Sequence, residues 1–132
     1  MGTEPVARRV LVVDDDADVR DAVRDFLLDE GYHVEEAADG EQGLASLTAA
    51  PVPTIVLLDL MMPGTSGWQF LDRLADHPFA RPIVVVMSAL RAEDLPVGLP
   101  CLRKPFSFDE LRDIMRELGA APVSRAAPAS PS

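Results

Sequence analysis

Two short apolar stretches, Val10-Leu11-Val12-Val13-Asp14 and Ile55-Val56-Leu57-Leu58-Asp59, decide how this chain folds. Each is apolar throughout until it stops on an aspartate. A continuous apolar run of this length is typical of a strand that is buried on both faces, as in a parallel sheet. Both stretches are therefore predicted to be buried strands whose carboxyl ends carry an acidic side chain.

Further strands and helices alternate along the rest of the chain. Three more strands are predicted at residues 32–37, 83–87 and 101–103. A helix after the first strand is predicted from five apolar residues at helical spacing, namely Val19, Ala22, Val23, Phe26 and Leu27. Helical patterns also follow the second, third and fifth strands, at 41–49, from Trp68 to before Pro78, and at 107–118. This order predicts a doubly wound α/β fold in which helices cover both faces of a five-stranded parallel sheet.

The segment between the fourth and fifth strands departs from this alternation. Only residues 89–100 connect the two strands, which is close to the lower limit for a crossover that contains a helix. Pro96, Gly98 and Pro100 disfavour helix in its second half. The fourth helix is therefore predicted to be short or missing, and the face that it would cover is predicted to be remodelled.

Length and composition limit the classes of function. The 132 residues carry 12 Lys and Arg against 22 Asp and Glu, a net charge of −10, and 48% of them are apolar. We expect one domain over residues 8–119, an extension at 1–7, and a disordered Ala/Pro/Ser-rich tail or linker stub at 120–132. The negative charge argues against nucleic acid or an anionic membrane as partner. Without a membrane-spanning run or a signal sequence, a cytoplasmic location is expected.

Polar residues at the strand ends form the candidate site. In a parallel sheet the functional crevice lies at the carboxyl ends of the strands, where the sequence places Asp14, Asp15, Asp59, Ser88 and Lys104. Neighbouring carboxylates need a compensating cation, and oxygen ligands suit Mg²⁺. A lysine and a hydroxyl can bind a phosphoryl group. The set is predicted to support phosphoryl transfer onto an aspartate.

Each of these residues also has an ordinary structural interpretation. Asp16 and Asp18 are predicted to cap and charge the first helix and not to belong to the site. Ser88 and Lys104 are unremarkable strand-end residues when each is considered alone. The functional prediction depends on the whole set.

The motifs that carry these residues resemble those of a known family. The run Val12-Val13-Asp14-Asp15, the segment from Leu58 to Gly64 with Gly67, the pair Ser88-Ala89 and the run Lys104-Pro105-Phe106 are similar to response-regulator receiver domains, single-domain chemotaxis regulators included. The resemblance spans about residues 8 to 119. It implies a flavodoxin-like strand order of 2-1-3-4-5 and a bacterial two-component or phosphorelay role.

The resemblance also assigns roles to the site residues. Asp59 would accept a phosphoryl group from a histidine kinase or phosphotransfer protein, Lys104 would pair with that group, and Ser88 would be the switch hydroxyl. Mg²⁺ would be held by Asp15, Asp59 and the backbone carbonyl of Met61, with Asp14 acting through water. A cis peptide before Pro105 is expected. The domain would catalyse only its own phosphorylation and dephosphorylation, and would signal by binding a further protein.

This chain departs from the family pattern at single positions too. Cys101 stands where the family often has an aromatic switch residue, so coupling through a moving ring is not expected. The cysteine is interpreted as a half-buried strand residue in preference to a redox sensor. Met61 and Leu90 occupy positions that influence water attack, and their apolar side chains predict slow self-dephosphorylation.

Three alternatives to the stand-alone signalling module stay open at this point. A phosphatase that uses an aspartate nucleophile ranks low, because it needs a second aspartate at position 61, where this chain has Met61. A pseudo-receiver that binds partners without phosphorylation is kept open by the short segment at 89–100. The chain could also be a fragment of a larger regulator or hybrid kinase, with residues 120–132 as the start of a linker.

Overall fold

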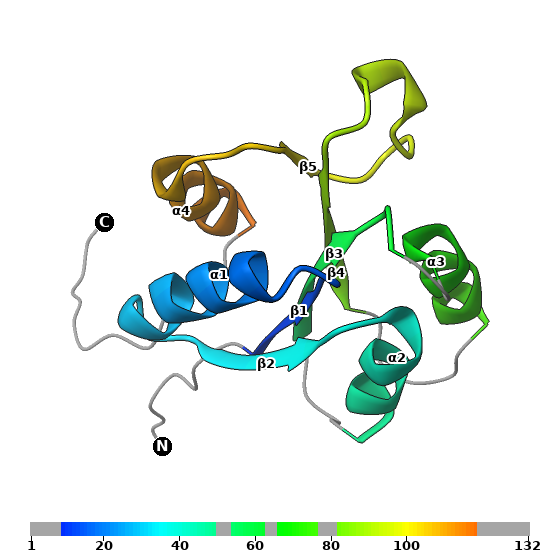
Figure 1. The fold of residues 1–132 in the computed structure, drawn as a ribbon, viewed down its shortest axis with the longest axis horizontal. Helices are drawn as coiled ribbons and strands as arrows, with labels where there is room; N and C mark the ends of the chain where they lie inside the picture. The colour runs from blue at the N-terminus through cyan, green and yellow to red at the C-terminus, as the bar shows by residue number, and fades with distance from the viewer. Residues whose placement is uncertain (1–8, 50–53, 63–65, 77–81, 119–132) are drawn as a thin grey trace.

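The computed structural model describes residues 9–49, 54–62, 66–76 and 82–118. These residues form five strands, four α-helices and one short 3₁₀ helix (Figure 1). In chain order the elements are β1 (Arg9–Val13), α1 (Ala17–Asp29), β2 (His33–Ala37), α2 (Gly40–Ala49), β3 (Thr54–Asp59), α3 (Gly67–Ala75), β4 (Ile83–Ser88), η1 (Ala92–Asp94), β5 (Cys101–Arg103) and α4 (Phe108–Glu117).

All five strands lie in one parallel sheet with the order β2-β1-β3-β4-β5. The register places Val13 beside Leu58, and Asp59 beside Met87. The carboxyl ends of the central strands therefore reach the same edge of the sheet. The predicted α/β fold and strand order are both confirmed.

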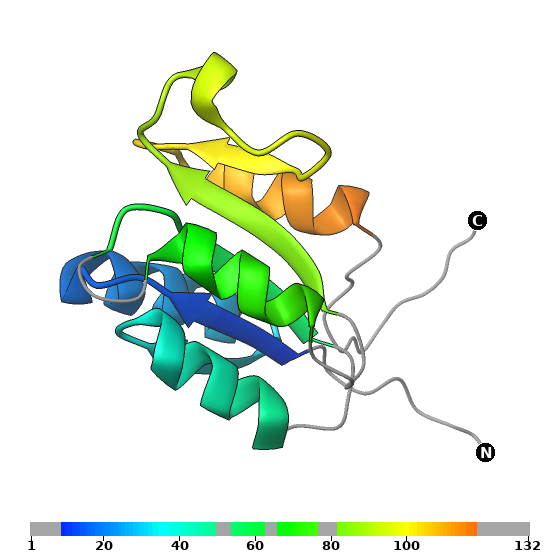
Figure 2. The same ribbon diagram turned by 90° about the vertical axis from the view of Figure 1, so that its right-hand side faces the viewer.

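Two helices cover each face of the sheet (Figures 1 and 2). Even-numbered residues of β1, such as Val10 and Val12, pack with α1 and α4, while Leu11 and Val13 pack with α2 and α3. Because successive side chains of a strand point to opposite faces, an uninterrupted apolar run fills both cores. This explains why the apolar stretches that define β1 and β3 show no polar alternation.

Capping residues set the start of three helices. The Asp16 side chain accepts hydrogen bonds from the backbone amides of Asp18 and Val19, and so begins α1. Ser66 and Ser107 form reciprocal capping boxes at α3 and α4. Gly31 follows α1 with φ of 98°, a left-handed conformation that glycine adopts without steric cost.

Four of the five apolar residues that predicted α1 pack into the core. Val23 and Leu27 are buried, and Val19 and Phe26 pack against the same core, but Ala22 is exposed. The buried stripe of the helix is therefore narrower than the apolar spacing indicated.

The segment between β4 and β5 contains a single turn of 3₁₀ helix, η1. In Figure 2 this segment projects beyond the end of the sheet. Proline at 96 and 100, and Gly98 with φ of 88°, stop further helix. The prediction of a short or missing fourth helix at this place is confirmed.

The terminal segments stay predictions. The extension at 1–7 and the tail at 120–132 lie outside the described residues, so the domain division that was predicted from composition is untested. Among the helices of the described ranges, none is long and apolar enough to cross a membrane.

Candidate phosphoryl-acceptor site

Four strands carry polar residues to one edge of the sheet. Asp14 follows β1 directly, Asp59 and Ser88 are the last residues of β3 and β4, and Lys104 follows β5. Asp14, Asp59 and Ser88 are the buried polar or charged residues of the described part of the chain. Because burial of unpaired polar groups is costly, their position needs compensating partners nearby.

Three carboxylates meet at this edge. Asp14, Asp15 and Asp59 each place an oxygen within 4.8 Å of the other two. Asp14 is fully buried, Asp59 is 5% exposed, and Asp15 is exposed. Burial, together with the negative charges of Asp14 and Asp15, raises the pKa of Asp59 to about 6, although the Met61 amide and Lys104 act in the opposite direction. The cluster is therefore short of positive charge.

Lys104 supplies part of that charge. Its Nζ lies 2.8 Å from Asp14 Oδ2 and 3.7 Å from Asp59 Oδ2. The expected cis peptide between Lys104 and Pro105 is present. The lysine thus reaches the cluster as predicted, but its shorter contact is to Asp14 and not to Asp59.

Ser88 links β4 to the loop that carries Lys104. Its backbone carbonyl accepts a hydrogen bond from the Lys104 amide at 2.8 Å. Its Oγ accepts one from the Leu90 amide at 3.0 Å. The register sets Ser88 one residue beyond Met87, the β4 partner of Asp59. The Ser88 hydroxyl therefore lies at the same edge of the sheet as the carboxylates, and the Leu90 amide two residues later holds it there.

The turn after β3 fixes the direction of Asp59. The Met61 amide donates to Asp59 Oδ1 at 3.0 Å, while the Met61 side chain is 61% exposed. Gly67, at the start of α3, donates its amide to the Leu60 carbonyl at 3.2 Å. A Cβ at Gly67 would lie 2.5 Å from the Asp59 carbonyl oxygen and 2.5 Å from Leu60 Cα. The close approach of α3 to the end of β3 therefore requires glycine. The role of the Met61 carbonyl stays a prediction.

The carboxylate cluster fits a hard divalent cation. It offers oxygen ligands from two adjacent loops, and the one nearby ammonium leaves an excess of negative charge. Such donors suit Mg²⁺, which binds one or two carboxylates and keeps other positions for water or phosphate oxygens. Asp16 and Asp18, in contrast, serve the start of α1 and are not members of the cluster, in agreement with the sequence prediction.

Cys101 shows no sign of a reactive thiol. Its side chain is partly buried in β5, and its Sγ donates to the Leu99 carbonyl at 3.4 Å. Burial raises the pKa of the Cys101 thiol. Since the thiolate is the reactive form, the geometry favours the structural interpretation of this residue.

Two features near the site were missed from the sequence. Arg20 donates from Nη1 to the backbone carbonyl of Asp14 at 2.7 Å. A groove of about 410 Å³ lies between α1 and the loop that begins with Lys104. Its lining residues are Val19, Ala22, Val23, Ala89, Lys104, Pro105, Phe106 and Phe108. The groove could have been suspected from the run Lys104-Pro105-Phe106, whose three residues all line it. Helical periodicity gave no such indication for Arg20, because it places that side chain in solvent.

Comparison with known proteins agrees with this arrangement. The family model described as "Response regulator receiver domain" matches residues 10–116. The phosphate regulon transcriptional regulatory protein PhoB of Escherichia coli (strain K12) is 37% identical over 129 residues, which cover 89% of this chain and 56% of PhoB. The chain thus spans about half the length of the curated relatives it matches.

Solved structures resemble the fold of this chain. A CheY-like receiver domain protein from Methanospirillum hungatei JF-1 is 31% identical, with a TM-score of 0.72 over 83% of this chain and 92% of that one. The response regulator TrrA from Thermotoga maritima, determined in complex with Mg²⁺ and BeF, is 29% identical with a TM-score of 0.73, over 84% of this chain and 98% of that one. With the family match covering most of its length, this chain belongs to the response-regulator receiver domains of two-component signalling.

Proposed function

We propose that Asp59 accepts a phosphoryl group from a histidine kinase or a histidine phosphotransfer protein in a Mg²⁺-dependent reaction. The observation that carries the proposal is the convergence of Asp14, Asp15 and Asp59 within 4.8 Å, beside the Lys104 ammonium. Receiver domains are signalling domains. In this chain, the carboxylates and the lysine that the reaction needs are all present at the proposed site.

The reaction needs an ionised carboxylate at Asp59. With a pKa of about 6, Asp59 is mostly ionised at neutral pH. One of its oxygens would attack the phosphorus atom while the bond from phosphorus to the donor nitrogen breaks. Bound Mg²⁺, held by Asp15, Asp59 and the Met61 carbonyl and through water by Asp14, would neutralise charge on the phosphoryl oxygens. The product is an acyl phosphate on Asp59.

Lys104 and Ser88 would bind the transferred group. The Lys104 Nζ lies 3.7 Å from Asp59 Oδ2, so a small movement away from Asp14 suffices to pair it with a phosphoryl oxygen. The Ser88 hydroxyl, at the end of the neighbouring strand, would turn inward to donate a hydrogen bond to another oxygen. Since the Lys104 amide is bonded to the Ser88 carbonyl, the two residues would move as connected parts.

The groove beside the site supports a protein as the phosphoryl donor. Lys104 belongs both to the groove and to the charged cluster, so a side chain docked in the groove would stand next to the acceptor. Most of the other lining residues are apolar, among them Val19, Val23 and Phe106. A donor that presents apolar side chains next to its phosphohistidine fits this surface.

The phosphorylated domain is proposed to pass on its signal by binding a downstream protein. The chain would catalyse only its own phosphorylation and dephosphorylation. A pseudo-receiver that works without phosphorylation, or a receiver fragment of a longer regulator, is the alternative that the short segment at 89–100 and the length of the relatives favour.

The experiment is phosphorylation by a small donor. The protein is incubated with phosphoramidate and Mg²⁺, and the labelled fraction is measured by intact mass spectrometry for the wild type, Asp59→Asn and Asp94→Asn. Labelling is expected for the wild type and for Asp94→Asn, whose substituted side chain is exposed in η1, but not for Asp59→Asn. Absence of label in the wild type would favour the pseudo-receiver, and label on Asp59→Asn would overturn the assignment of the acceptor.

A further inference from the structure

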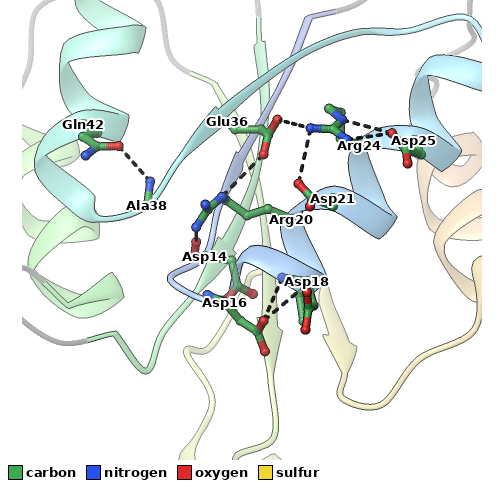
Figure 3. Close-up of polar contacts among 11 residues, drawn as sticks. Asp14, Asp16, Asp18, Arg20, Asp21, Arg24, Asp25, Glu36, Ala38 and Gln42 are labelled. Carbon is green, nitrogen blue, oxygen red and sulfur yellow. Dashed lines mark hydrogen bonds and ion pairs between the residues drawn. The ribbon is translucent and has the colours of Figure 1, made fainter.

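Arg20 lies outside the carboxylate cluster but contacts its backbone (Figure 3). It stands in the first turns of α1, and its side chain is 18% exposed. Its Nη1 donates to the Asp14 carbonyl oxygen at 2.7 Å, and its Nε lies 3.4 Å from Glu36 Oε1 on β2. One guanidinium therefore joins the end of β1 to the neighbouring strand.

Glu36 fixes the orientation of that guanidinium. Its second oxygen, Oε2, accepts a hydrogen bond from Arg24 Nη1 at 2.9 Å. Arg24 is itself bonded to Asp25 and Asp21 on the same helix (Figure 3). With both oxygens of Glu36 engaged, the carboxylate has little rotational freedom. The position of Arg20 is set by β2 as well as by its own helix.

The carbonyl that Arg20 binds belongs to the peptide between Asp14 and Asp15. The amide on the other side of Asp14 is bonded to the Ala37 carbonyl at 3.1 Å. The Asp14 side chain accepts from the Asp16 amide at 2.9 Å and from Lys104 at 2.8 Å. Asp14 is thus held at its amide, carbonyl and carboxylate, and the contact from Arg20 fixes the plane of the peptide that leads into Asp15.

Asp15 depends on that peptide for its direction. Within the described ranges, no hydrogen bond or ion pair holds the Asp15 carboxylate, which is exposed. Rotation of the peptide between Asp14 and Asp15 would swing this carboxylate out of the cluster. Groups that orient metal ligands from behind commonly change metal affinity about 10- to 100-fold when they are removed.

We propose that Arg20, held by Glu36, is a positioning residue that sets the peptide between Asp14 and Asp15 and so preorganises the two carboxylates for the cation. This inference rests on the proposed Mg²⁺-dependent function of the cluster. It assigns Arg20 a role that helical periodicity does not indicate, and it distinguishes Arg20 from Arg24, which contacts Glu36 but not the backbone of Asp14.

Calorimetric titration with MgCl₂ tests the proposal in the full chain. Arg20→Ala is expected to weaken Mg²⁺ binding about tenfold or more, and Arg20→Lys, which keeps the charge but lacks the forked guanidinium, is expected to fall in between. Arg24→Ala is the matched control, because it removes an arginine from Glu36 and leaves the contact to the Asp14 carbonyl. Arg24 acts on Arg20 only through Glu36, so the Mg²⁺ affinity of Arg24→Ala is expected to fall clearly less than that of Arg20→Ala, by no more than about threefold.

Hydrogen exchange of the metal-free protein provides a second measurement. The Asp16 amide, bonded to Asp14 Oδ1, is expected to exchange faster in Arg20→Ala than in Arg24→Ala, at equal global stability from urea unfolding. If Arg20→Ala does not fold, Arg20→Lys carries the test. Wild-type affinity and exchange in the Arg20 variants would overturn the inference and leave the proposed function intact. Failure of the wild type to bind Mg²⁺ would instead count against the proposed function.

Discussion

The loops that follow β1 and β3 differ sharply from the segment that follows β4. In the first two loops, side chains and backbone are tied together at short range, as in the contacts of Asp14 with Asp16 and of Asp59 with Met61. The segment at 89–100 instead has one 3₁₀ turn, and Val97 within it is 99% exposed. Short-range hydrogen bonds therefore hold the loops at the proposed acceptor site. The segment at 89–100, which departs from the family pattern, is held less closely.

We expect substitutions to be tolerated better in residues 89–100 than at the ends of β1 and β3. The site that holds mutually repelling carboxylates close together is tightly packed and has little space for an added atom. A segment whose side chains are exposed to solvent has such space. If phosphorylation changes the position of Ser88, the change reaches residues 89–100 through the Leu90 amide and the loop of Lys104 through the Ser88 carbonyl. Matched substitutions in the two regions test this difference.

The largest effect is expected from a single methyl group at Gly67. In Gly67→Ala the new Cβ would overlap the Asp59 carbonyl and Leu60 Cα, both backbone atoms at 2.5 Å. Because backbone must shift to relieve the overlap, the free energy of unfolding should fall by about 3 kcal/mol or more. Urea unfolding followed by circular dichroism measures the change.

Gly98→Ala is the matched control in the looser region. A Cβ at Gly98 meets no atom within 4 Å, and only the positive φ of 88° opposes it. The expected loss is about 1 kcal/mol. An equal or larger loss in Gly98→Ala than in Gly67→Ala would show that residues 89–100 are not the looser region.

The second largest effect concerns the pH dependence of stability at Asp59. Folding raises the pKa of Asp59 from 3.8 to about 6, mainly through burial, so the folded protein binds this proton more strongly than the unfolded chain does. Below pH 4 Asp59 is protonated in both states and does not lower the free energy of unfolding. As the pH rises from 4 to about 6, ionisation of Asp59 lowers this free energy progressively, and above pH 6 the loss stays constant. Asp59→Asn should be more stable than the wild type by about 2–3 kcal/mol at pH 7.5, and the gain should disappear near pH 4.

Urea unfolding in EDTA between pH 4 and 8 measures this difference. Asp94→Asn, in the exposed turn η1, is the control and should follow the wild-type profile. Added Mg²⁺ should reduce the advantage of Asp59→Asn, since the cation compensates the wild-type cluster. A constant difference between Asp59→Asn and wild type across the whole range would contradict the prediction.

Much of the contrast could be predicted from the sequence. The apolar runs of β1 and β3 predicted a parallel sheet, and the polar residues at the strand ends then had to meet at one edge. Pro96, Gly98 and Pro100 predicted the loss of helix before β5. These conclusions follow from short-range rules of backbone geometry and strand burial.

Other features depend on tertiary contacts that periodicity does not encode. Arg20 reaches back six residues to a backbone carbonyl, a contact that depends on where β2 places Glu36. Lys104 lies closer to Asp14 than to the predicted acceptor, at 2.8 Å against 3.7 Å, a difference that the order of residues at the strand ends does not encode. Ala22 is exposed because it faces the groove between α1 and the Lys104 loop and not the core.

The third effect concerns the lifetime of the phosphorylated protein. Met61 and Leu90 each follow a site residue by two positions, Asp59 and Ser88 respectively, and neither apolar side chain can orient a water molecule. The double variant Met61→Asn, Leu90→Glu is expected to lose its phosphoryl group about tenfold faster than the wild type, because a polar side chain can position the attacking water. The decay is measured by mass spectrometry after removal of the donor.

Conservative changes separate this effect from packing. Met61→Leu with Leu90→Met keeps both positions apolar and should decay at the wild-type rate. Equal lifetimes for the polar double variant and the wild type would show that water access is controlled elsewhere.

The smallest effects are expected within residues 89–100 itself. Leu95 is partly buried against the core that includes Phe70 and Val86, while Val97 contacts little because it is 99% exposed. Leu95→Ala should therefore cost about 1 kcal/mol of unfolding free energy, and Val97→Ala should stay within about 0.5 kcal/mol of the wild type. Both variants should reach wild-type labelling with phosphoramidate, since neither residue contacts the carboxylate cluster. If Leu95→Ala is folded but labelled less than the wild type, residues 89–100 shape the acceptor site directly. The two regions would then differ in how tightly they pack but not in their importance for phosphorylation.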